Sequence, residues 1–225
     1  MKSRSIIILS SVIILFSLFI GSLLKAEDGW EFQKIKEGVE IYLRDVPGSE
    51  YREYKGIMDV RDARVTSLVA AFYDTPSYTR WMHNCIESRL LKILNPYERY
   101  TYTVIHAPWP AKNRDTISYS LVRQDPNDLT VTIAITGKPD YISPMKNRVR
   151  IPYMNALWTF KPLVTGEVRV SYQTVNDAGG WLPLKLLNMS MIDMPFLTMV
   201  KLRNIIKESK YTKAVFSVIA EPRWN

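Results

Sequence analysis

The chain has 225 residues, of which 47% are hydrophobic, enough for one sizeable core and a single main domain. Lysine and arginine outnumber aspartate and glutamate by 30 to 22, for a formal net charge of +8, but the cations are scattered without a basic run, which argues against a nucleic-acid-binding protein. One cysteine excludes an intrachain disulfide, and two histidines are too few for a histidine-rich metal site.

The N-terminal segment has the layout of an export signal. Lys2 and Arg4 precede an uncharged run over residues 5–24 that is rich in Ile, Leu and Phe. The run is also long enough to span a bilayer as a helix, and Leu24 stands where cleavage sites usually have a small residue. Residues 1–26 are therefore predicted to be either a signal peptide or an N-terminal membrane anchor, and the positive start predicts that the rest of the chain is exported.

Most of the chain up to residue 176 is predicted as strands. Residues 30–36 are predicted as a short helix, and runs over 39–46 and 51–60 form a hairpin around a Pro-Gly-Ser turn. Apolar residues at helical spacing predict a helix within 63–74, followed by a short helix or turn over 76–85. Further strand-like runs cover 86–94, 99–106, 116–123, 129–136, 148–161 and 167–176. The short turns between them favour an antiparallel sheet.

A long helix is predicted at the C-terminal end, over residues 181–210. Pro195 cannot donate a hydrogen bond to the preceding turn, so a kink or interruption is expected at Asp193-Met194-Pro195. The helix is unusually rich in methionine, with Met189, Met191, Met194 and Met199. It is interpreted both as an amphipathic helix that closes a core and as a flexible, polarizable surface for variable apolar partners.

Motifs of known enzymes are mostly absent. The chain has no Gly-rich phosphate loop, no Gly-x-Ser-x-Gly and no His-Glu-x-x-His, and Ser143 begins a Ser-x-x-Lys match that lacks the companion motifs. Cys85 is interpreted as a small buried apolar residue. Were the protein an enzyme, His106 and Arg114 would be the only credible catalytic residues. No catalytic residue, metal or cofactor is predicted.

Two motifs are the most specific signals in the chain. Residues 108–115, PWPAKNRD, place two prolines around a tryptophan ahead of a strand-like run, which predicts a rigid extended elbow. Residues 179–183, GGWLP, follow a strand with two glycines that can take positive φ and then begin the last helix. Arg114 and Asp115 are adjacent on a strand, so their side chains point to opposite faces, and each is expected to hold a neighbouring loop.

Together these motifs resemble the START (StAR-related lipid-transfer) domain. Phosphatidylcholine-transfer-like members carry a similar Pro-aromatic-Pro…Asn-Arg-Asp segment and a similar Gly-Gly/Trp-Leu-Pro start of the last helix. The resemblance implies an α+β helix-grip fold, in which a curved antiparallel β-sheet wraps around a long C-terminal α-helix and encloses a hydrophobic cavity. Residues 27–215 are then predicted to form a START-like lipid-binding domain of a bacterial exported member, with residues 216–225 as a C-terminal tail.

A cavity for an apolar ligand needs apolar volume and a few polar anchors. On the strand over 116–123, hydrophobicity alone places Ile117, Tyr119 and Leu121 inward, whereas the family pattern places Thr116, Ser118 and Ser120 there; we follow the family. Arg114 is included because one of the Arg-Asp pair could meet a polar headgroup. The predicted ligand-binding residues are Tyr78, Trp81, Met82, Thr103, Arg114, Thr116, Ser118, Trp158, Tyr172, Thr174, Met189, Met191 and Met194.

The chain departs from its best-known relatives at the headgroup positions. The Arg…Asp pair that meets phosphate in phosphatidylcholine-binding relatives aligns with Tyr78 and Met82, which are uncharged. The Arg of the buried Glu–Arg pair in sterol-binding relatives falls near Ser120. The positions of the aromatic cage for a quaternary ammonium are occupied by Thr103, Thr116 and Met154. A less polar ligand is therefore expected, such as a fatty acyl chain or a diacylglycerol-like lipid.

The resulting prediction is a non-enzymatic protein that binds, and transfers, an apolar lipid or hydrophobic metabolite in the cell envelope, periplasmic or secreted. Without residues 1–26 the formal net charge falls from +8 to +5, because three cations and no carboxylate are lost, which favours contact with an anionic membrane surface. The alternatives are a polyketide-cyclase/aromatase-like enzyme on the same scaffold and a membrane-tethered interaction module with a vestigial cavity.

Overall fold

The computed structural model describes residues 29–222, except for the side chains at 184, 185 and 188–190. The predicted signal or anchor, residues 1–26, lies outside the described residues. Within the described part, no helix is both long enough and apolar enough to cross a membrane.

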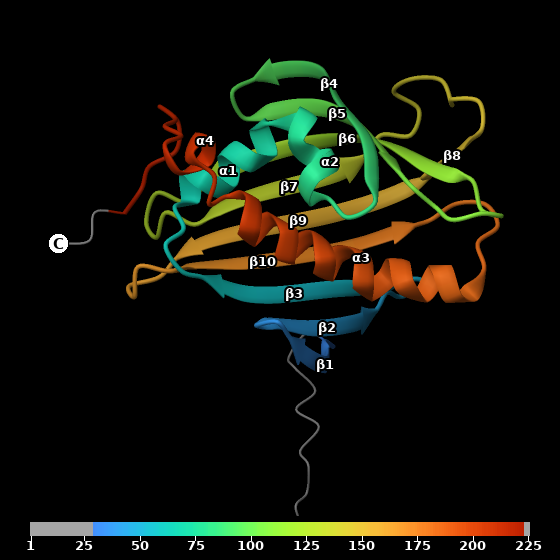
Figure 1. The fold of residues 1–225 in the computed structure, drawn as a ribbon, viewed down its shortest axis with the longest axis horizontal. Helices are drawn as coiled ribbons and strands as arrows, with labels where there is room; N and C mark the ends of the chain where they lie inside the picture. Colours follow the sequence, from blue (N-terminus) through green and yellow to red (C-terminus); the bar gives the residue numbers. More distant parts are fainter. Residues whose placement is uncertain (1–28, 223–225) are drawn as a thin grey trace, which may run out of the picture.

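One ten-stranded sheet dominates the fold (Figure 1). Its order is β1-β2-β3-β10-β9-β7-β6-β5-β4; neighbours along this path are antiparallel, and the short β8 pairs parallel to β6. The strands are β1 (Glu31–Lys36), β2 (Val39–Asp45), β3 (Arg52–Val60), β4 (Cys85–Asn95), β5 (Glu98–Ile105), β6 (Asn113–Gln124), β7 (Val131–Gly137), β8 (Arg148–Arg150), β9 (Tyr153–Pro162) and β10 (Val168–Asp177). The predicted antiparallel sheet and helix-grip fold are confirmed.

The helices lie together on one face of this sheet, with α3 running across it (Figure 1). They are α1 (Val65–Tyr73), the 3-10 turn η1 (Thr75–Ser77), α2 (Tyr78–Trp81), α3 (Leu184–Ile205) and α4 (Ser209–Thr212). The main hydrophobic cluster fills the space between them, with the side chains of Phe72, Trp81, Phe160 and Met199 almost fully buried. Burial of one face of each helix against the sheet is what holds this layer in place.

The prediction of a helix over residues 30–36 is wrong. Residues 31–36 form β1, which pairs antiparallel with β2 at the edge of the sheet. A helix this short gains little from its own hydrogen bonds, whereas pairing with the β2–β3 hairpin satisfies the backbone of β1. Trp30, just before the strand, is buried beneath the cations of Arg44 and Lys55, which lie 4.4 and 4.3 Å from its ring.

The segment after α4 packs against the rest of the domain. Ile219 is buried in the main cluster, and Phe216 packs on Tyr73 with ring centroids 5.2 Å apart. The Glu221 carboxylate accepts hydrogen bonds from the backbone N–H of Val65 at 3.3 Å and of Thr66 at 2.6 Å. It therefore caps the first turn of α1, where a negative charge is favoured, and the described part of the predicted tail helps to hold α1.

Helix α3 continues through Pro195 and bends along its length (Figure 1). Pro195 removes the N–H that would bond to the carbonyl four residues earlier, so a bend is expected on physical grounds. One turn later, the Thr198 hydroxyl donates a 2.8 Å hydrogen bond to the Met194 carbonyl. Of the two outcomes predicted at Pro195, a kink or an interruption, α3 shows the bend and remains one helix.

Candidate functional site

A cavity of about 640 Å³ lies between the sheet and the helices. Strands β5, β6, β7, β9 and β10 supply one wall, and α2 and α3 supply the other. Its apolar lining includes Ile105, Ile133, Ile135, Met154 and Leu197. A concave, mostly apolar space of this size is typical of a small-molecule site.

The inward face of β6 is the one implied by the family pattern. Thr116, Ser118 and Ser120 line the cavity. Ile117 is fully buried on the other face, in a second cluster with Tyr102 and Val104. Simple hydrophobicity misleads here because both faces of β6 are covered, one by the cavity and the other by this cluster.

Aromatic side chains form the deep wall of the cavity. Trp158 stacks on Tyr172, with ring centroids 3.9 Å apart and an angle of 9° between the planes. Phe72 contacts both Trp81 and Trp158, at centroid distances of 5.0 and 5.2 Å. Burial raises the pKa of Tyr172 to about 12, so its hydroxyl remains protonated and the wall carries no charge at neutral pH.

Eleven of the thirteen predicted ligand-binding residues line this cavity, and whether they contact a ligand stays a prediction. They are Tyr78, Trp81, Met82, Thr103, Arg114, Thr116, Ser118, Trp158, Tyr172, Thr174 and Met194. Met191 is not among the cavity-lining residues; it lies on α3 beside a separate shallow depression shared with Tyr51 and Arg52. Met191 and Met194 share roughly one face of α3, but Met191 lies nearly one turn closer to the N-terminal end of the helix, towards Tyr51 and Arg52 and away from the cavity. The side chain of Met189 lies outside the described residues.

The two sequence motifs meet at one end of the cavity. Arg114 donates hydrogen bonds to the carbonyls of Lys112 at 2.5 Å and Trp181 at 3.0 Å, and longer ones of 3.4 Å to Ala178 and Gly179. The elbow before β6 is thus fastened to the GGWLP segment that begins α3. Arg114 lines the cavity as well, but its guanidinium is already hydrogen-bonded to backbone carbonyls.

Gly179 shows why the second motif needs glycine. Its φ is +65°, and a Cβ there would lie 3.0 Å from the Arg150 carbonyl oxygen. An L side chain would therefore meet both backbone strain and a steric clash. The close approach lets the segment run beside β8 before α3 begins.

Asp115 points away from the cavity, as the alternation along β6 predicts. Its carboxylate accepts hydrogen bonds from Arg150 Nε at 3.1 Å and Nη2 at 2.9 Å, and from the Tyr102 hydroxyl at 3.1 Å. Arg150 also donates to the carbonyls of Pro139 and Ile142. The expected role of Asp115 in holding a neighbouring loop is therefore confirmed.

The sequence reasoning missed Arg99, which lines the cavity while only 6% of it is exposed. Burial lowers its pKa from the ordinary arginine value. It lies on β5 on the same face as Thr101 and Thr103, directly opposite Ser120 of β6. Counting back by twos from the predicted Thr103 would have found it, but in the run ERYTYTV it looks like an ordinary surface charge.

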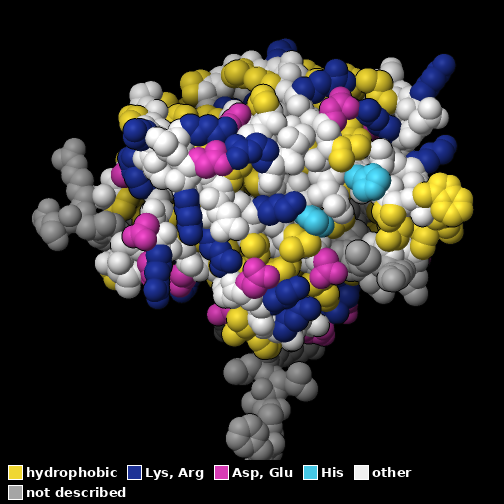
Figure 2. Space-filling view, viewed as in Figure 1, with side chains coloured by type: hydrophobic (Ala, Val, Ile, Leu, Met, Phe, Trp, Pro, Cys, Tyr) yellow, Lys and Arg dark blue, Asp and Glu magenta, His cyan; other side chains and the backbone are white. Residues whose placement is uncertain are grey.

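The candidate groups for chemistry lie on the lining of the cavity. His106 is exposed at the rim of the cavity, and Arg114 is held by carbonyls. Burial lowers the pKa of His83, the other histidine on the lining; both histidines are visible on the face shown in Figure 2. Among the described residues, no three His, Cys, Asp or Glu side chains come together as a metal site.

The sequence profile of the START domain matches residues 18–193. The chain belongs to the START domain family. A Pseudomonas aeruginosa protein of uncharacterised function is 34% identical over 179 residues, which cover 80% of this chain and 87% of that protein. The crystal structure of a fragment, residues 25–204, of the STAR-related lipid transfer protein from Xanthomonas axonopodis is 33% identical, with a TM-score of 0.74 over 80% of this chain and all of that one.

Human STARD10 shares the START fold at 21% identity. Its crystal structure superposes with a TM-score of 0.71 over 83% of this chain and 76% of that one. The profile match and the Xanthomonas relative confirm the predicted START family, and a bacterial member is consistent with that relative. In this START domain the two motifs hold the elbow and the start of α3, whereas the cavity is made by the strands and helices around them.

Proposed function

We propose that this START domain binds an apolar or amphiphilic lipid in its cavity and carries it within the cell envelope, without a catalytic step. The observation that carries the proposal is the space of about 640 Å³ between the sheet and α3, with its aromatic and aliphatic lining. The name of the Xanthomonas relative, a lipid transfer protein at 33% identity, supports the same reading. The volume argues against a vestigial cavity filled by bulky side chains.

The route for the lipid runs past the elbow and α3. The lining residues His106 and Pro108 are exposed, so the cavity reaches the surface beside the elbow. Release of a bound lipid requires α3 or this loop to move. The bend at Pro195, which itself lines the cavity, is the place where α3 could hinge, because its backbone hydrogen bonding is already weakened there.

The same end of the molecule carries a surface suited to a membrane. Trp109 is 91% exposed and Trp181 is 68% exposed, and they neighbour the cavity-lining residues Pro108 and Leu182. Figure 2 shows hydrophobic side chains gathered at the corresponding edge of the molecule, to the right. Tryptophan is favoured at the boundary between lipid and water, so we infer that this edge faces the membrane during loading and release.

The test uses residues 29–225, because a fragment of the Xanthomonas relative that aligns with 80% of this chain crystallises on its own. Lipid extraction and mass spectrometry should find a bound lipid. The protein should also move a fluorescent fatty acid from donor to acceptor vesicles. Absence of both bound lipid and transfer would contradict carriage.

Two matched variants locate the site. Ala156→Phe adds a ring on the cavity side of β9, whereas Ala134→Phe adds the same ring to an exposed position on the adjacent strand β7. Ala156→Phe should lose most of the bound lipid, and Ala134→Phe should keep it, with both variants folded by circular dichroism. Equal lipid content in Ala156→Phe and Ala134→Phe would place the ligand outside this cavity.

A W109A/W181A double variant should keep the lipid but transfer it more slowly.

A further inference from the structure

Arg99 is a buried cation at the β5–β6 wall of the cavity, near the end of α1. Only 6% of the residue is exposed, and it lines the cavity beside Thr101. Its guanidinium carbon lies 3.4 Å from the centroid of the Tyr73 ring. Contact with an aromatic face lowers the cost of burying the cation, but it provides no hydrogen-bond acceptor.

The hydrogen-bonding capacity of this guanidinium is largely unused. Its Nε has no partner among the described residues, and its one hydrogen bond, from Nη1 to the Tyr73 carbonyl, is 3.5 Å long. No described carboxylate forms an ion pair with it. By contrast, the guanidiniums of Arg150 and Arg114 are bonded to acceptors on several sides. A buried charge without a counterion is costly, so Arg99 is poised to gain from an anion.

The lining of the cavity offers further hydrogen-bond donors besides Arg99. Trp81, which also lines the cavity, has an indole N–H without a partner among the described residues. The hydroxyls of Thr101 and Ser120, on the strands beside Arg99, can donate as well. This end of the cavity therefore suits a group that only accepts hydrogen bonds, as a carboxylate or phosphate does.

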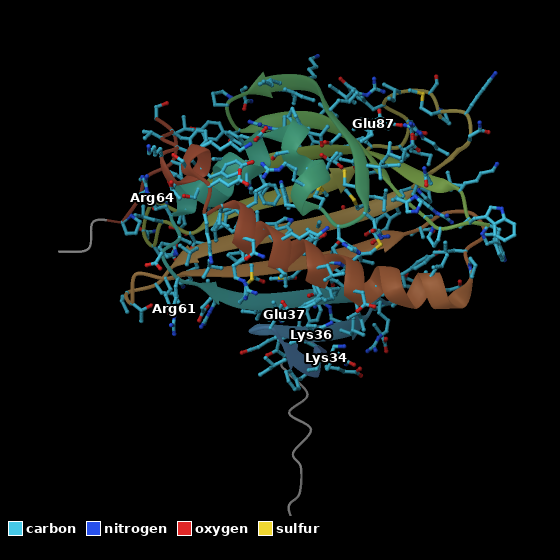
Figure 3. All side chains as sticks on the ribbon, viewed as in Figure 1. Lys34, Lys36, Glu37, Arg61, Arg64 and Glu87 are labelled. Carbon is cyan, nitrogen blue, oxygen red and sulfur yellow. The ribbon has the colours of Figure 1, made fainter. Side chains whose placement is uncertain are left out.

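The charged residues on the cavity lining also favour a negatively charged ligand. The described lining carries three cations, Lys36, Arg99 and Arg114, and a single carboxylate, Asp193. Arg114 is already bonded to carbonyls, and Lys36, labelled below α3 in Figure 3, is exposed to solvent and lies 4.6 Å from the Phe196 ring. Arg99 is thus the cation best placed to meet a negatively charged ligand inside the cavity.

We propose that Arg99 anchors the anionic head of a single-chain amphiphile, a carboxylate or a phosphate monoester, whose tail occupies the apolar part of the cavity. The inference rests on the proposed function and narrows its ligand class. Six residue steps along β5 separate Arg99 from Ile105, which pairs with Arg114, a rise of about 20 Å. The head lies at the Arg99 end, and the tail extends along the β5–β6 wall towards the elbow.

The test compares ligands that differ only at the head. Residues 29–225 are freed of bound lipid and titrated with palmitate, with 1-palmitoyl lysophosphatidate, with hexadecanol and with inorganic phosphate. Palmitate or the lysophosphatidate should bind at least about tenfold more tightly than hexadecanol, the factor that one hydrogen bond to a charged group contributes. The tighter of the two anionic lipids identifies the head, and inorganic phosphate should bind far more weakly than either.

Arg99→Gln should remove this preference by weakening the anionic lipids at least about tenfold, while hexadecanol binding stays within about twofold. Arg123→Gln is the matched control, because Arg123 is exposed on the neighbouring strand β6. A second readout separates anchoring from a structural role. Without ligand, Arg99→Met should unfold at the same or a higher temperature than the wild type, because an unpaired buried charge has been removed.

The possible failures are distinct. If no lipid binds, the proposed function and this inference both fall. If palmitate, the lysophosphatidate and hexadecanol bind alike, or if Arg99→Gln keeps the preference, only the role of Arg99 is overturned. If inorganic phosphate binds as tightly as the lipids, the site holds a free anion and the lipid-head assignment is wrong. A lower unfolding temperature for Arg99→Met would make Arg99 a structural residue.

Discussion

Replacing Asp115 by asparagine should break the buried ion pair that stands behind the elbow. The side chain of Asp115 is 1% exposed and that of Arg150 is 9% exposed, with 2.9 Å between Oδ2 and Nη2. Asparagine has the same shape but carries no charge, and only one of its two terminal atoms accepts hydrogen bonds. The Arg150 cation would then be left buried without its counterion.

The structure indicates how much free energy of unfolding Asp115→Asn should lose. Breaking a buried pair by removing one partner costs about 3 to 5 kcal/mol. Arg150 retains its bond to the Ile142 carbonyl at 2.9 Å, and asparagine still offers one oxygen, so the lower end, about 3 kcal/mol, is expected. For a domain of this size, that corresponds to a melting temperature lower by roughly 6 to 12 °C.

The free energy of unfolding is measured by urea denaturation at pH 7, with Asp128→Asn as the control. Asp128 also pairs with a cation, Lys161 at 3.3 Å, but their side chains are 46% and 53% exposed, so its loss should cost much less than the loss of Asp115. Lipid content should not change in Asp115→Asn, because Asp115 points away from the cavity. A cost no greater than that of Asp128→Asn would refute the assignment of Asp115 and Arg150 as a stabilising buried pair.

Two further predictions concern packing and reactivity. A Cβ at Gly56 would overlap Met199 Sδ and lie 2.5 Å from the Tyr54 hydroxyl oxygen, so Gly56→Ala should push α3 from β3 and cost about 1 to 3 kcal/mol; an unchanged melting temperature would show that this contact is loose. Burial raises the pKa of the Cys85 thiol to about 11 from the ordinary 9.0, which lowers its thiolate fraction at pH 8 roughly a hundredfold. Iodoacetamide should therefore modify Cys85 slowly in the native protein and quickly in urea, and equal rates would contradict its burial.

Much of the fold could be predicted from local signals. Alternating strands, short turns and a long C-terminal helix suffice for an antiparallel sheet with a covering helix, and PWPAKNRD and GGWLP are specific enough for the family. The errors occur where tertiary contacts outweigh local preference. Residues 31–36 gain more as a strand on β2 than as an isolated helix. At Pro195 the expected bend occurs, and packing on the sheet lets α3 continue beyond it.

The cavity was predicted only in part, for a physical reason. Period-two alternation shows that Arg99, Thr101 and Thr103 share a face, but it does not show which face is inside. The other face of β5 and β6 is covered as well, because Tyr102 and Ile117 are buried there with Ile142 packed against them. Hydrophobicity cannot separate a packed face from a cavity face when other elements cover both.

The sequence by itself determined the glycine-dependent start of α3 and the opposite faces of Arg114 and Asp115. These follow from backbone geometry, which neighbouring residues dictate. The predicted extended elbow, by contrast, is a turn at residues 108–111, closed by a 3.0 Å hydrogen bond from the Ala111 N–H to the Pro108 carbonyl. Tertiary structure alone decided that Arg114 is bonded to carbonyls, that Asp115 is paired, and that Arg99 is buried without a counterion. Whether a buried charge has a partner depends on residues far apart in the chain, and the ligand class proposed here rests on that difference.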